Sequence, residues 1–174
     1  MAHALRAVAA AYERLVVALA VIAGAAIALG FALIVVDVTV RALGLRPPAY
    51  TGAIVEYVLL YFTLFAAPYL VRRKGHVTVD ALVSRLAGRP RWIVEKLGYL
   101  VCVLTALAFA YVGFRLGYDA IRSGSIEERS IDVPSWVDYA PLGPVFLIVA
   151  IEFARYLLGF DSLHRDRTQA SESL

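Results

Sequence analysis

A run of 22 residues without a single charge, from Leu15 to Val36, constrains this chain more than any other feature. As a helix it is about 33 Å long, close to the roughly 30 Å hydrocarbon core of a bilayer. Three further apolar stretches follow, and 61% of the 174 residues are hydrophobic. The sequence therefore predicts an all-α integral membrane protein with four transmembrane helices, over residues of about 10–41, 50–72, 92–122 and 134–158.

The second apolar stretch ends in three cations, Arg72, Arg73 and Lys74, which we expect to stay at the lipid headgroups. Beyond them the apolar residues recur at i, i+3, i+4 and i+7, at Val79, Leu82, Val83 and Leu86. An apolar face of about eleven residues is too short to cross a bilayer. The pattern predicts a short amphipathic helix over about 77–87 that lies in the membrane interface between the second and third spans.

Prolines interrupt the start of the fourth span, where Pro141 and Pro144 flank Gly143. Because proline cannot donate a backbone hydrogen bond, we expect this helix to bend or to become regular only after them. The polar residues 123–132 before it are expected to be a loop. Residues 1–160 are predicted to form a single membrane domain, and residues 161–174 a polar cytoplasmic tail.

The distribution of lysine and arginine predicts the orientation in the membrane. With the N-terminus inside, the inner segments hold 12 of the 17 Lys and Arg residues and the outer loops hold 5. Cytoplasmic segments carry the excess of positive charge. Both termini are therefore expected to be cytoplasmic, in a multi-pass protein of the bacterial inner membrane.

Glu56 is the one carboxylate well inside a predicted span. Intramembrane acids are costly and often functional, so an ion- or proton-coupling role is one interpretation. A structural pair with an arginine at the outer surface is another, and contact with a helix of a partner protein is a third. The charges expected near the same level are Asp37, Arg41, Arg115, Asp119 and Asp138.

Other charged residues form candidate sites at the two membrane surfaces. Asp37 and Arg41 have the i, i+4 spacing of a helix pair. The outer charges either dock a soluble partner or are solvated by headgroups; they include Arg115, Asp119, Glu128 and Arg129. At the inner surface anionic lipid is a candidate ligand, with membrane anchoring as the simpler role, for Arg72, Arg73 and His76. Glu152 and Arg155 are expected to pair with each other or with Glu13 and Arg14.

Several function classes find no support in the sequence. The three histidines lie outside the spans, so axial ligand pairs for haem are missing. Cys102 is the only cysteine, and no metalloprotease, nucleophile-elbow or phosphate-loop motif is present. The basic residues lie between apolar runs, which indicates membrane topology instead of nucleic-acid binding. We expect no enzyme, no cofactor, no metal and no nucleic-acid partner.

The central stretch resembles the small membrane subunit, DctQ-like, of tripartite ATP-independent periplasmic (TRAP) transporters. In that family a basic stop precedes a Gly-His-hydrophobic-x-Val-Asp motif, matched here by Gly75, His76 and the Val79–Asp80 pair. The fourth helix of the family opens with Pro-x-Trp and then a Pro-hydrophobic-Gly step, matched by residues 134–136 and 141–143. The second helix departs from the family, because Gly52 and Ala53 replace acids found after an aromatic-Thr/Ser pair.

The resemblance implies a supporting subunit. In such transporters a periplasmic binding protein captures an organic anion, and a large membrane subunit carries the substrate and sodium by symport. The small subunit would form a heterodimer with the large one, its first two helices packing on the fixed scaffold. Two alternatives stay open: a self-sufficient dimeric proton-coupled transporter that uses Glu56, and an assembly factor of another membrane complex.

Overall fold

Four long helices account for most of the chain in the computed structural model, which describes residues 2–73, 89–128 and 132–159. They are α1 (Ala2–Ala42), α2 (Thr51–Arg72), α4 (Arg89–Ser123) and the pair α5 (Trp136–Tyr139) and α6 (Leu142–Leu157), which together form the fourth span. All four spans are long and apolar enough to cross a membrane, so the predicted fold class is confirmed. The expected interfacial helix over 77–87 and the tail 161–174 lie outside the described residues.

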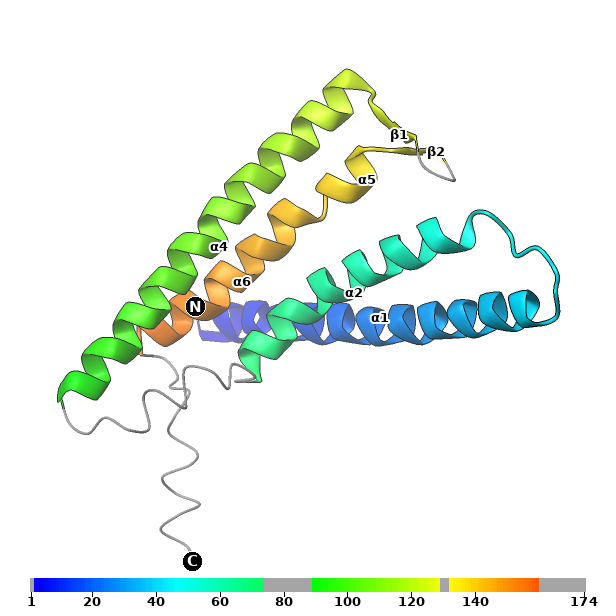
Figure 1. Cartoon of the computed structure of the whole chain (residues 1–174). Coiled ribbons are helices and arrows are strands. Elements are labelled where there is room, and N and C mark those ends of the chain that lie inside the picture. The colour runs from blue at the N-terminus through cyan, green and yellow to red at the C-terminus, as the bar shows by residue number, and fades with distance from the viewer. Residues whose placement is uncertain (1, 74–88, 129–131, 160–174) are drawn as a thin grey trace, which may run out of the picture.

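The helices lie side by side in a single layer, in the order α1, α2, α6, α4 (Figure 1). α1 packs on α2, and α4 packs on α6. A smaller contact between α2 and α6 joins these two helix pairs. One end of the layer carries Arg72, Arg73 and Arg155 and is called the arginine end below. The opposite end carries the turn after α1 and the strands β1 (Ile126–Glu128) and β2 (Asp132–Pro134), and is called the hairpin end.

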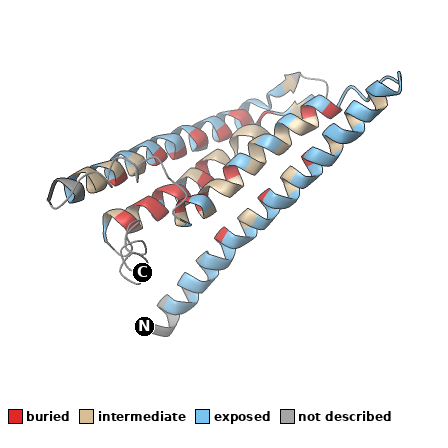
Figure 2. Ribbon diagram, turned by 60° about the horizontal axis from the view of Figure 1, so that its bottom comes forward, coloured by how far each residue is buried: buried red, intermediate tan, exposed pale blue. Residues whose placement is uncertain are grey.

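A layer one helix thick leaves most side chains on its two faces. In the apolar central part of each span, the share of buried residues rises from 11% in the first span to 33% in the fourth. Figure 2 shows the buried residues as a narrow seam along α6 and the facing side of α4, with most of α1 exposed. Both faces of the layer must therefore be covered by lipid or by a partner protein.

Small residues allow the helices of each hairpin to approach closely. On α1 the buried residues Val16, Ala23 and Gly30 recur every seven positions and face α2. A Cβ atom on Gly30 would lie 2.8 Å from Cγ1 of Val58. Since lipid tails are as apolar as these side chains, close van der Waals packing stabilises helix pairs in a membrane.

Small residues also allow α4 to approach the fourth span, and here the helices lie even closer together. A stripe of small buried residues on α4 faces α5 and α6: Ala106, Ala110, Gly113, Gly117 and Ala120. A Cβ on Gly113 would lie 2.6 Å from the backbone N of Gly143 and 2.8 Å from Cβ of Leu142. Glycine is therefore required at position 113 for this helix crossing.

The fourth span is interrupted at Pro141, as the sequence predicts. α5 ends at Tyr139, and Pro141 is the residue immediately before α6. Where a loop is expected over 123–132, the structure has part of a β-hairpin. Its two strands are antiparallel, with Ile126 opposite Pro134. Each strand has only three residues, too few for an alternating pattern to be recognised in the sequence.

Candidate functional site at the arginine end

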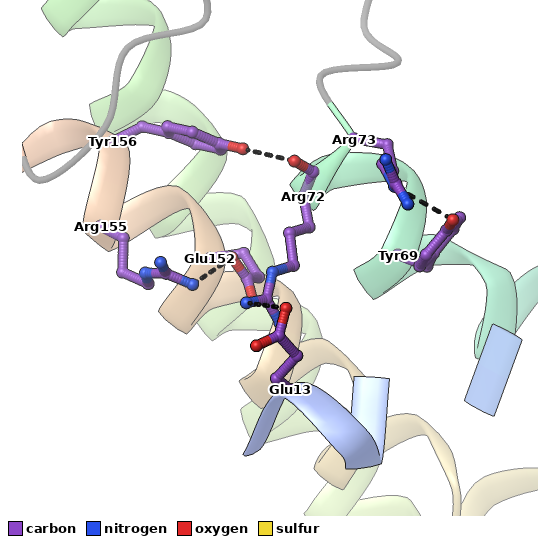
Figure 3. Close-up of polar contacts among 7 residues, drawn as sticks. All are labelled: Glu13, Tyr69, Arg72, Arg73, Glu152, Arg155 and Tyr156. Carbon is purple, nitrogen blue, oxygen red and sulfur yellow. Dashed lines mark hydrogen bonds and ion pairs between the residues drawn. The ribbon is translucent and has the colours of Figure 1, made fainter. Parts of the chain in front are cut away.

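Charged side chains from three helices meet at the arginine end (Figure 3). On α6, Nη1 of Arg155 lies 3.1 Å from Oε2 of Glu152, which confirms the predicted pair. Glu152 is only 1% exposed, so its carboxylate is buried within the layer. Nη2 of Arg72, on α2, lies 3.4 Å from Oε1 of Glu13, on α1. The first pair lies within α6, and the second joins α2 to α1.

Two side chains satisfy backbone carbonyls where helices end at this site. The hydroxyl of Tyr156 lies 3.1 Å from the carbonyl oxygens of both Val71 and Arg72, and donates to them at the end of α2. Nζ of Lys96, on α4, donates to the carbonyl oxygens of Tyr156 (2.9 Å) and Leu157 (2.5 Å) at the end of α6. The last carbonyls of a helix have no partner within the helix, so these bonds fasten the ends of α2 and α6 to their neighbours.

The hydroxyl of Tyr12, on α1, interacts with the buried carboxylate of Glu152, on α6. Nη1 of Arg72 is also buried and has no hydrogen-bond partner among the described residues. Arg72 and Glu152 also line a hollow of about 350 Å³, together with Glu13, Tyr69, Arg73 and Arg155. Leaving a buried polar atom unpaired costs about 1–3 kcal/mol. The cluster therefore retains hydrogen-bonding capacity that water or a polar ligand group can use.

Arg73 takes a different direction from Arg72. Its Nε donates to the hydroxyl of Tyr69 at 3.0 Å, and its guanidinium carbon lies 5.3 Å from the centre of that ring. The pair lies at the edge of the same hollow, where Figure 3 shows Arg73 and Tyr69 apart from the ion pairs. Of the three cations predicted to end the second span, Arg72 joins α2 to α1, whereas Arg73 is exposed.

The charged residues predicted at the hairpin end lie on different helices and strands. Nε of Arg41 lies 2.7 Å from Oδ2 of Asp37, so the predicted i, i+4 pair is present. Arg115 and Asp119 are exposed on α4. Glu128 belongs to β1, while His76, Asp80 and Arg129 lie outside the described residues.

Glu56 is exposed, near the start of α2. It lines a hollow of about 290 Å³ with two further acids, Glu127 and Asp138. Among the described residues lining that hollow there is no arginine, and the expected arginine partner of Glu56 stays a prediction. Beside it, the hydroxyl of Tyr61 donates to the carbonyl oxygen of Val137 at 2.6 Å and joins α2 to α5.

The family of the chain follows from a comparison with family sequence models. Residues 30–160 match the DctQ component of tripartite ATP-independent periplasmic transporters. The chain belongs to the DctQ family. This confirms the resemblance stated from the sequence, and the family is a transporter component. A search of curated proteins returns no match.

The DctQ match covers α2, α4 and α6, but begins after the part of α1 that carries Tyr12 and Glu13. Sequence reasoning did not identify Tyr12, Lys96 and Tyr156 as members of the site. Tyr156 is adjacent to Arg155 in the sequence, and Lys96 lies at the basic end of its span. These positions indicate only weakly that both residues belong to the cluster at the arginine end. Their partners are backbone carbonyls and groups on other helices, which a sequence does not place.

Proposed function

We propose that this chain is the small membrane subunit of a TRAP transporter and supports the large membrane subunit in a heterodimer. The observation that carries the proposal is the DctQ match over residues 30–160. The single layer of helices supports it, because long apolar faces remain exposed on both sides. A layer of this kind suits a protein that packs along a larger neighbour.

We further propose that this transporter takes up organic anions, that a periplasmic binding protein delivers them, and that uptake is coupled to sodium. This proposal rests on the family resemblance and on exposed charged residues at the hairpin end, such as Arg115 and Asp119. The hollows described above lie at the two ends of the layer. None of these hollows joins the two membrane surfaces, which favours a supporting role over a solute path within this chain.

The test is reconstitution with the large membrane subunit encoded with this chain. We expect the two to co-purify one to one. Sodium-gradient uptake in proteoliposomes should then require both subunits and the binding protein. If this chain alone drives proton-coupled flux that Glu56→Gln abolishes and Asp119→Asn does not, the self-sufficient transporter is correct. If it stabilises an unrelated complex and has no effect on uptake, it is an assembly factor.

We also propose that the arginine end faces the cytoplasm of the bacterial cell, because the inner segments would hold 12 of the 17 Lys and Arg residues. In this orientation residues 1–160 form one domain of the inner membrane and residues 161–174 a cytoplasmic tail. The hairpin end, with Glu127, would face the periplasm.

Cysteine labelling in intact cells tests this orientation. In a Cys102→Ala background, Ser125→Cys at the hairpin end should react with a membrane-impermeant maleimide. Arg6→Cys, at the arginine end, should react only after the membrane is permeabilised. Both positions are exposed, so labelling reports sidedness. The reverse pattern would place the termini outside.

A further inference from the structure

Besides the hollow of about 350 Å³, the arginine end has another hollow, of about 600 Å³. It adjoins the ion cluster and lies between the start of α1 and the end of α6. Its walls are apolar and include Ala9, Ala10 and Ile151. The small side chains of the two alanines leave an open trough along α1, and both alanines are exposed. At membrane depth such a trough is filled by an apolar chain, either from lipid or from protein.

The polar residues of this hollow are predominantly cationic. Arg6, Arg72 and Arg155 line it with Glu13. Glu13 pairs with Arg72 and the deeper Glu152 pairs with Arg155, so three arginines and two carboxylates leave a net charge of +1 at this site. Nη1 of Arg72 has no acceptor among the described residues. Arginine presents several donors in a planar fork that matches phosphate oxygens.

We propose that this groove binds one anionic phospholipid, with its phosphate among Arg6, Arg72 and Arg155 and an acyl chain along the alanine trough. The arginines lie where the predicted spans reach the headgroups, which is the depth of a lipid phosphate. The alanine trough lies next to them, where the acyl chain of the same lipid begins. A lipid in this position would contact both α1 and α6 and would add to the contact of Tyr12 with Glu152. It would thereby fasten the first helix at the arginine end.

The test uses the full chain, alone and in complex with its large subunit, in nanodiscs and by native mass spectrometry. Phosphatidylglycerol should be retained in preference to phosphatidylcholine and should raise the unfolding temperature. Arg6→Gln removes one exposed cation and should weaken retention about five-fold. Ala10→Trp fills the trough without a change of charge and should weaken retention as well. Arg115→Gln, at the hairpin end, is the matched control and should have no effect.

Three outcomes would overturn the proposal. The two lipids could be retained equally, which would mean that the cations do not select a headgroup. Arg6→Gln and Arg115→Gln could have equal effects, which would indicate general surface charge. Inorganic phosphate alone could stabilise the chain as much as phosphatidylglycerol, which would indicate a site for free phosphate. None of these measurements depends on transport, so their failure would leave the proposed function intact.

Discussion

Replacing Arg155 with methionine is expected to lower the free energy of unfolding by about 3 kcal/mol. The reason is the position of Glu152, whose side chain is 2% exposed and whose Oε2 lies 3.1 Å from Nη1 of Arg155. The side chain of Arg155 is 39% exposed, but its removal leaves the buried carboxylate without the cation that it contacts. Leaving a buried charge unpaired is more costly than replacing both members of a pair. The midpoint of thermal unfolding in detergent measures the loss, followed by a thiol-reactive fluorophore on Cys102, which is packed beside the core.

Two further variants make this prediction specific to the pair. The double variant Glu152→Gln/Arg155→Met removes both charges and should recover most of the lost stability, because no buried charge remains. Arg115→Met makes the same chemical change at an exposed position and should cost less than about 0.5 kcal/mol. Equal losses in Arg155→Met and Arg115→Met would show that the buried pair contributes nothing particular to stability.

Gly113→Leu is expected to separate α4 from the fourth span and to lower the free energy of unfolding by about 3 kcal/mol or more. Even a Cβ at this position would lie 2.6 Å from a backbone nitrogen, and a backbone cannot move aside without displacing the helix. Gly113→Ala should give a smaller loss in the same direction. The same Cys102 assay detects both, because Cys102 lies on α4 and packs against the affected core.

Gly24→Leu is the matched control for Gly113→Leu. A Cβ on Gly24 would meet nothing within 4 Å, and this glycine is exposed on α1. Leucine has a higher helix propensity than glycine, so this variant should be neutral or slightly stabilising. A loss at Gly24 as large as that at Gly113 would show that the effect reports glycine replacement in general and not the crossing of α4 with α6.

The features that the sequence predicts well depend on residues within a single helix or span. The charge-free run Leu15–Val36 predicts its span because a membrane core excludes charges. Pro141 predicts the interruption of the fourth span from its own covalent structure. The pairs Asp37–Arg41 and Glu152–Arg155 follow from spacing along one helix, where i, i+3 and i, i+4 residues are neighbours.

Contacts between different helices cannot be predicted from spacing within one helix. Arg72 pairs with Glu13 across two helices, and Tyr156 donates to the carbonyls at the end of α2. Both contacts depend on the order α1, α2, α6, α4, which no spacing within a single helix encodes. The stripe of alanines and glycines on α4, from Ala106 to Ala120, was the available indication of a tight helix contact. It does not say which helix lies opposite.

The arrangement of the helices as one layer has a mechanical consequence. The layer separates whatever lies on its two faces by the diameter of one helix with its side chains, about 10 Å. The same helices line both faces, so a tilt of α2 or α6 caused by a neighbour on one side displaces the surface on the other side directly. Because the layer is one helix thick, we expect a displacement of one face to be transmitted to the opposite face through the same helices.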